Sequence, residues 1–144
     1  MTHPFAGLWV AAFATLIYHL SSKTTPESAN LFVVLIASYI GAIVLSIAAL
    51  FLTRATGEVT PSIAKLNWTT VGLAIGIFGI ELGYLLLYRS QMNVSLGMIT
   101  VEAIVAMLLV PLGLFIFRER LTTGNLLGVV CTCVGLLLLT QKRW

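Results

Sequence analysis

Five apolar stretches, joined by short polar segments, occupy nearly all of the chain. They cover residues 5–22, 31–53, 71–88, 94–117 and 121–141. Each is close to the roughly 20 residues that a helix needs to cross the hydrocarbon core of a bilayer. Because lipid offers the backbone no hydrogen-bond partners, a spanning segment of this kind must be helical. The sequence therefore predicts an all-α integral membrane protein, with one membrane domain over residues 1–144 built from five transmembrane helices.

The composition agrees with a membrane location. Hydrophobic residues make up 59% and charged residues 9%, and the mean hydropathy is +1.04. A water-soluble domain of this composition would expose large apolar patches. We interpret the first stretch as a span and not as a cleavable signal, because Met1 to Pro4 has no Lys or Arg and no small-residue cleavage site follows Leu20. The first and fifth stretches have the shortest apolar cores, but five spans are favoured over four or three.

The links between the stretches contain residues typical of helix ends. Thr25, Pro26 and Glu27 predict an N-cap, a proline in the first turn and an acid at the positive end of the second helix. We expect Thr122 or Thr123 to cap the last helix in the same way. The short link 89–93 makes the third and fourth spans antiparallel neighbours.

Positive charge is spread evenly over the two sides of the membrane. One side of a five-span arrangement carries Arg54, Lys65, Arg118 and Arg120, and the other carries Lys23, Arg89, Lys142 and Arg143. Lys and Arg normally stay on the cytoplasmic side and so set the orientation. The four-to-four split predicts either insertion in both orientations or an orientation that helix hydrophobicity or a partner decides.

The last two spans carry a family resemblance. The segments 97–102 (GMITVE), 117–122 (FRERLT) and 126–139 (LLGVVCTCVGLLLL) resemble the end of an EamA repeat of the drug/metabolite transporter superfamily. The final helix also resembles that of the small multidrug resistance proteins. Larger members of the superfamily have ten helices in two five-helix repeats of opposite orientation, and this chain is similar to one repeat. Two copies inserted oppositely would rebuild the ten-helix arrangement.

The chain departs from these relatives at two places. Arg118 stands where the EamA pattern usually has a glycine before the Glu-Arg-Leu turn. The small multidrug resistance proteins have an essential glutamate in their first helix, whereas the first span here has Val10, Ala11 and Ala12 in that region. The second departure argues against a direct transfer of their proton-coupled cation exchange.

Two carboxyl groups, Glu81 and Glu102, are the charges inside the apolar stretches. A charge in the bilayer costs a few kcal/mol, so such a residue indicates a functional site that faces protein or a water-filled cavity. We predict that Glu102 is the principal group for substrate and proton coupling, with Glu81 as its helper at a similar depth. The alternative is that each acid is a protonated hydrogen-bond partner between helices.

The third span has two opposite faces. A count of about 100° per residue puts Glu81 near Phe78, Tyr84 and Tyr88, which we predict to line a cavity and to attract an organic cation; an aromatic packing face is the commoner alternative. The opposite face carries four glycines. These are Gly72, Gly76, Gly79 and Gly83. Small residues let helices approach closely in lipid, so this face predicts packing or dimerisation.

Other polar and small residues complete the predicted site. Met98 and Ser95 lie near Glu102 by helical spacing, and Thr15 and Tyr18 share a face of the first span, where they would line an entrance or hydrogen-bond between helices. His19 and Ser22 lie on the same side of that span. Gly124, Gly128 and Gly135 predict a dimerisation face on the last span. Cys131 and Cys133 are two residues apart and cannot form a Cys-x-x-Cys pair.

The sequence contains no nucleotide-binding glycine loop, catalytic triad, zinc motif or nucleic-acid patch. We therefore expect no enzyme activity, no cofactor, no metal and no nucleic-acid partner. The predicted function is a secondary transporter subunit that moves a small metabolite or organic cation by alternating access in a bacterial inner membrane, with proton coupling as one option. We expect it to act as a homodimer, for which an antiparallel arrangement is one option, or with a paired small membrane subunit. The alternatives are a non-transporting structural or regulatory subunit and half of a lipid-linked flippase.

Overall fold

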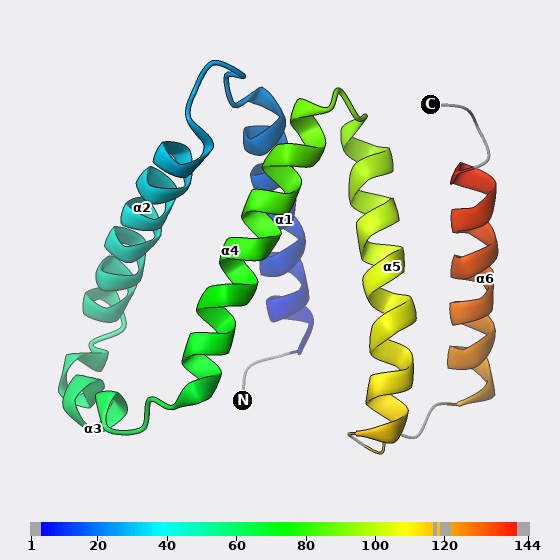
Figure 1. Cartoon of the computed structure of the whole chain (residues 1–144). Coiled ribbons are helices and arrows are strands. Elements are labelled where there is room, and N and C mark those ends of the chain that lie inside the picture. Colours follow the sequence, from blue (N-terminus) through cyan, green and yellow to red (C-terminus); the bar gives the residue numbers. More distant parts are fainter. Residues whose placement is uncertain (1–3, 117, 119–121, 141–144) are drawn as a thin grey trace. The chain divides into compact units, whose positions relative to one another are not determined.

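The computed structural model describes residues 4–116, 118 and 122–140. Within these residues the chain is helical and forms no strand. The helices are α1 (Pro4–Thr24), α2 (Leu31–Leu52), the 3-10 turn η1 (Ala55–Glu58), α3 (Val59–Ile63), α4 (Trp68–Arg89), α5 (Val94–Phe115) and α6 (Thr123–Thr140), as Figure 1 shows. The all-α prediction is confirmed.

Four of these helices are long and apolar enough to cross a membrane: α1, α2, α4 and α5. The chain is thus a multi-pass integral membrane protein. In α6, the apolar segment Thr123–Gly135 is shorter than a membrane span. The fifth crossing therefore stays a prediction, although α6 is present as the fifth long helix.

The N-terminus of α2 differs from the prediction. The side chain of Asn30, and not Thr25, caps the helix: its oxygen accepts hydrogen bonds from the backbone N–H groups of Phe32 at 2.9 Å and Val33 at 3.4 Å. Thr25 instead donates its hydroxyl to the carbonyl of Ser21 at 3.0 Å. Because Asn30 immediately precedes Leu31, the first helical residue, it can reach two free N–H groups that Thr25 cannot reach.

Two other helix starts follow the same rule. Asn67 caps α4 by accepting from the N–H of Thr69 at 2.9 Å, so that the helix begins at Trp68, three residues before the predicted position. Thr122 accepts from the N–H of Asn125 at 3.3 Å. This confirms a threonine cap on α6.

The structure forms two compact units. Unit 1 contains α1 up to His19 together with α5 and α6, and unit 2 runs from Leu20 to Ser90 and contains the end of α1, α2, η1, α3 and α4. In unit 1, α5 packs against α6; in unit 2, α2 packs against α4. Each pair is antiparallel (Figure 1).

Few side chains are buried in either unit. In unit 2 the buried residues of the long helices include Leu35 of α2 and Tyr84, Leu85 and Tyr88 of α4. The buried residues of α5 are small, namely Gly97, Ala103 and Gly113. Long stretches of apolar side chains lie on the outside of the helices, which is the arrangement that a lipid environment favours.

Candidate functional site

Two cations fasten the loop between α1 and α2 to the end of α4. The Arg89 guanidinium donates to the carbonyl of Pro26 at 3.4 Å and to that of Ala29. The Lys23 ammonium donates to the carbonyl of Tyr88 at 3.2 Å. Lys23 and Arg89 lie in the last turns of α1 and α4, where the helix dipole and the free carbonyls favour positive charge.

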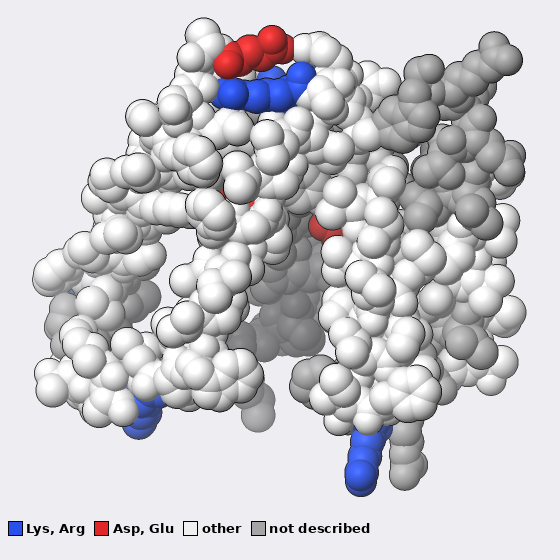
Figure 2. Space-filling view, viewed as in Figure 1, with Lys and Arg blue, Asp and Glu red and all other residues white. Residues whose placement is uncertain are grey.

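Charged side chains gather at the ends of the helices. On the face drawn in Figure 2, Lys and Arg side chains lie at the helix ends, and the surface between them is almost entirely uncharged. This distribution is the one expected for helices that cross a bilayer, because a charge in the hydrocarbon core is costly.

Glu81 is half-buried on α4 and faces α2. There it interacts with the hydroxyl of Tyr39, although the geometry falls short of a full hydrogen bond. From the sequence, Glu81 was expected to lie on the face opposite the glycines and to point toward a cavity or a partner. In unit 2, this face of α4 meets α2. The role of Tyr39 was not predicted from the sequence, although Tyr39 is the only ionisable residue in α2 and could have been noticed for that reason.

The aromatic residues near Glu81 differ in exposure. Tyr84 and Tyr88 are buried and stack on each other, with ring centroids 5.8 Å apart and an angle of 26° between the planes. Phe78 is 41% exposed. The buried stack suits the packing alternative for these two tyrosines, because neither ring presents an open face to a ligand.

The glycine face of α4 is open. At Gly72, Gly76, Gly79 and Gly83, no described atom beyond the neighbouring residues and the nearby backbone of α4 itself lies within 4 Å of the position that a Cβ atom would take. No other described element therefore lies close to this face. Packing or dimerisation through it stays a prediction.

Glu102 lies on α5 in unit 1, and its side chain is exposed. Its charge interacts with His19 of α1 in the same unit. His19 is only 3% exposed and makes an edge-on contact with the ring of Tyr18, whose centroid is 5.2 Å away. From the sequence, His19 was expected to line an entrance or to hydrogen-bond between helices, and its interaction with Glu102 was not predicted. The sequence feature that could have pointed to this residue is that His19 is the only histidine in the predicted spans.

The other predicted lining residues are spread over unit 1. Thr15, Tyr18 and Met98 are half-buried, and Ser95 is exposed. None of them lines the cavity between α5 and α6, and their role stays a prediction. Glu81 and Glu102 belong to different units, so their proposed cooperation is a matter for experiment.

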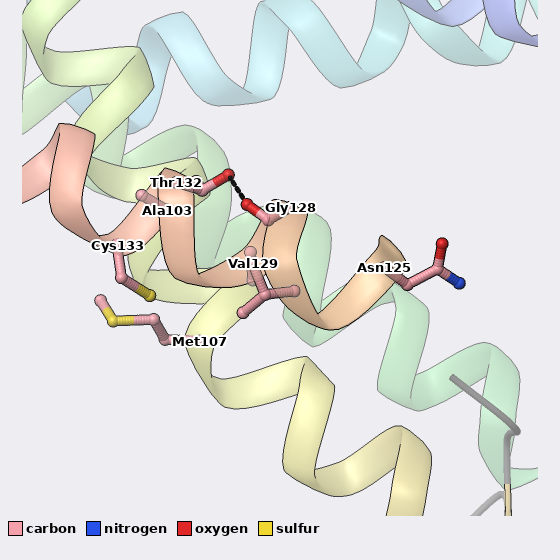
Figure 3. Close-up of a pocket in the computed structure, with 8 residues that line it drawn as sticks. Ala103, Met107, Asn125, Gly128, Val129, Thr132 and Cys133 are labelled. Carbon is pink, nitrogen blue, oxygen red and sulfur yellow. Dashed lines mark hydrogen bonds between the residues drawn. The ribbon is translucent and has the colours of Figure 1, made fainter. Parts of the chain in front are cut away.

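A cavity of about 350 Å³ lies between α5 and α6. Its walls are Ala103, Ala106 and Met107 of α5 and Asn125, Gly128, Val129, Thr132 and Cys133 of α6. In Figure 3 the side chains of Met107 and Cys133 lie together, while Asn125 lies apart from them in the first turn of α6. The Thr132 hydroxyl donates to the carbonyl of Gly128 at 2.9 Å, so it serves its own helix. The cavity is mainly apolar and contains no acid.

The two carboxyl groups inside the membrane helices each have a partner that could take part in proton transfer or hydrogen bonding. Each unit has one carboxyl group within a membrane helix, and each carboxyl interacts with a titratable ring on another helix. Among the residues that the structure describes, no three His, Cys, Asp or Glu side chains gather as a metal site would require.

A family model described as the EamA-like transporter family matches residues 4–141. The chain belongs to the EamA-like transporter family. The match covers both units and all the long helices, and it confirms the resemblance seen in the last two spans. This EamA-like protein is therefore a membrane transporter of the drug/metabolite superfamily. Comparisons with curated proteins and with solved structures each gave no match.

Proposed function

We propose that this EamA-like protein is a secondary transporter subunit that moves a small metabolite or an organic cation by alternating access, coupled to protons through Glu102 with Glu81 as helper. Membership of the family supports transport. The observation that carries the coupling is the interaction of Glu102, in the membrane helix α5, with the buried His19 of α1. A carboxyl and an imidazole in such a place can both take up and release a proton.

Glu102 would act by exchange. Its carboxylate can hold a proton or the positive charge of a ligand, and holding one excludes the other. His19 is the titratable residue that interacts electrostatically with this carboxyl, and its imidazole would stabilise the charged form of Glu102 when it carries a proton. An exposed carboxyl side chain gives a ligand direct access to that charge.

The proposed assembly is a dimer in a bacterial inner membrane, either an antiparallel homodimer or a pair with another small membrane subunit. Inverted repeats commonly enclose a transporter's substrate site near the midplane, and the even distribution of Lys and Arg is compatible with two orientations. Helical spans support an inner membrane, because proteins that span the bacterial outer membrane are mainly β-barrels.

The test uses the purified full chain in liposomes that contain a pH-sensitive dye. Candidate metabolites and organic cations are added outside, and we expect at least one to drive proton movement. Glu102→Gln should reduce this movement to the level of empty liposomes, while Glu102→Asp, which keeps the carboxyl, should retain part of it. Proton-coupled transport by Glu102→Gln at the wild-type rate would refute the proposed role of Glu102.

A further inference from the structure

The contact between Tyr39 and Glu81 lies in register with the packed end of the α2–α4 pair. Leu35 of α2 and Leu85 of α4 are 2% and 5% exposed. Tyr39 follows Leu35 by one helical turn, and Glu81 precedes Leu85 by one turn. Because the helices are antiparallel (Figure 1), these two steps lead in the same direction. Tyr39 and Glu81 therefore form the next layer of the same interface.

The following layer is open. One turn further, Ile43 of α2 is 59% exposed and Ile77 of α4 is 48% exposed. The residue pair Tyr39–Glu81 thus marks the point where the close packing of the two helices ends. On one side of it lie buried side chains, and on the other side the facing surfaces of α2 and α4 are uncovered.

The Tyr39 hydroxyl oxygen is buried, and no group in the described part of the chain completes a hydrogen bond with it. The Glu81 carboxyl is the group with which it interacts. A buried hydroxyl without a hydrogen bond is unfavourable, so a small adjustment that brings the phenol O–H onto the carboxylate is favourable.

We propose that Tyr39 is a positioning residue for proton uptake: its hydroxyl holds the Glu81 carboxylate across the α2–α4 interface and sets the proton concentration at which that carboxyl is protonated. This inference rests on the proposed proton coupling and extends it from α4 to α2. When a proton arrives, it binds a carboxylate oxygen of Glu81, and the phenol keeps its own proton. The phenol O–H then loses its charged acceptor, and the α2–α4 contact weakens at the layer where the packing ends.

Few other titratable groups lie near Glu81 in unit 2. Helix α2 contributes Tyr39 alone. On α4, Tyr84 and Tyr88 form the buried stack, and Arg89 donates to carbonyls of the α1–α2 loop. From the end of α1, Lys23 donates to the carbonyl of Tyr88. Tyr39 is thus the titratable residue that approaches Glu81 from a different helix.

The experiment is an infrared titration of the full chain in nanodiscs, with the proton itself as the probe. The absorption of the protonated Glu81 carboxyl is identified as the band that disappears in Glu81→Gln. The variant Tyr39→Phe removes only the hydroxyl. In it, we expect the Glu81 carboxyl to be half-protonated at a proton concentration about tenfold lower than in the wild type, because the carboxylate loses a hydrogen-bond donor worth roughly 1.4 kcal/mol. Tyr84→Phe removes a hydroxyl from the same helix as Glu81 and should leave the titration unchanged.

An unchanged titration in Tyr39→Phe, or an equal change in Tyr84→Phe, would overturn the inference. If Tyr39→Phe does not fold, the wild-type spectrum decides: the Glu81 band should have the lower frequency of a hydrogen-bonded carboxyl, and the frequency of a free carboxyl would contradict the inference. The titration needs no transported ligand. A failure of Glu102→Gln to affect transport would therefore refute the proposed function without changing this result.

Discussion

The two membrane carboxyls have different partners, and the difference suggests different tasks. Glu81 is half-buried and interacts with a phenol, whereas Glu102 is exposed and interacts with an imidazole. A phenol with an ordinary pKa near 10 stays neutral at physiological pH and acts through hydrogen bonding. An imidazole can carry a proton in that range. The pair Glu102–His19 in unit 1 therefore contains two groups that can exchange protons, whereas the pair Glu81–Tyr39 in unit 2 contains one such group and a neutral hydrogen-bond donor.

The largest expected effect comes from removing the two carboxyls in turn. Glu102→Gln should abolish proton-coupled transport in liposomes, because it removes the group that exchanges the proton for the ligand. Glu81→Gln should reduce transport only about tenfold, which corresponds to an interaction of roughly 1.4 kcal/mol. The inverse ranking, with Glu81→Gln the more damaging variant, would show that unit 2 contains the principal site.

The second prediction concerns the two faces of the membrane. The four-to-four distribution of Lys and Arg should place a reporter fused to the C-terminus on both sides of the membrane. Three lysines inserted after Met1 should move most of the signal to one side, because positive charge is retained in the cytoplasm. A wild-type chain with the reporter on one side alone would rule out an antiparallel homodimer.

The third prediction compares the contributions of two arginines to stability: Arg89, which donates to loop carbonyls, and Arg54, which is exposed. Arg89→Ala should lower the free energy of unfolding by about 1–3 kcal/mol, because it removes the side-chain donor to the Ala29 carbonyl and one of the two donors to the Pro26 carbonyl. Arg54→Ala, at an exposed position, should change it by less than about 0.5 kcal/mol. Unfolding in detergent mixtures, followed by circular dichroism, measures both. Equal effects would show that the loop contacts contribute no stability.

The smallest effects distinguish the helix caps of the two units. Asn30→Ala should cost about 1 kcal/mol, because the side chain accepts from two N–H groups. Thr122→Ala should cost about 0.5 kcal/mol, the lower end for a cap, because its one bond to Asn125 is long at 3.3 Å. The same unfolding measurement applies. A larger loss for Thr122→Ala would show that the start of α6 depends on more than this bond.

The apolar stretches predict the helices well, because a backbone in lipid has few alternatives to a helix. They do not predict which helices meet. A count of 100° per residue places Glu81 opposite the glycines of α4, but it cannot show that α2 brings Tyr39 to that face. The same holds for His19 and Glu102, which are 83 positions apart in the sequence but interact electrostatically in the folded unit.

Capping errors have a more local cause. Thr25, Pro26 and Glu27 match a helix start by residue type, but Asn30 is closer to the first helical residue and accepts two N–H groups. Four residues separate the two candidates. A residue-type pattern cannot rank them, because the outcome depends on how the turn between Pro26 and Ala29 closes.

The contacts of Arg89 imply an order of assembly during synthesis. The loop after α1 receives its hydrogen bonds from a residue 60 positions later than Ala29 and 63 positions later than Pro26. Pro26 and Ala29 leave the ribosome well before Arg89. The loop can therefore form these hydrogen bonds only after α4 has been synthesised. The loop between α1 and α2 is therefore completed by α4, and a chain that stops before Arg89 would lack the two hydrogen bonds that this arginine donates to the loop.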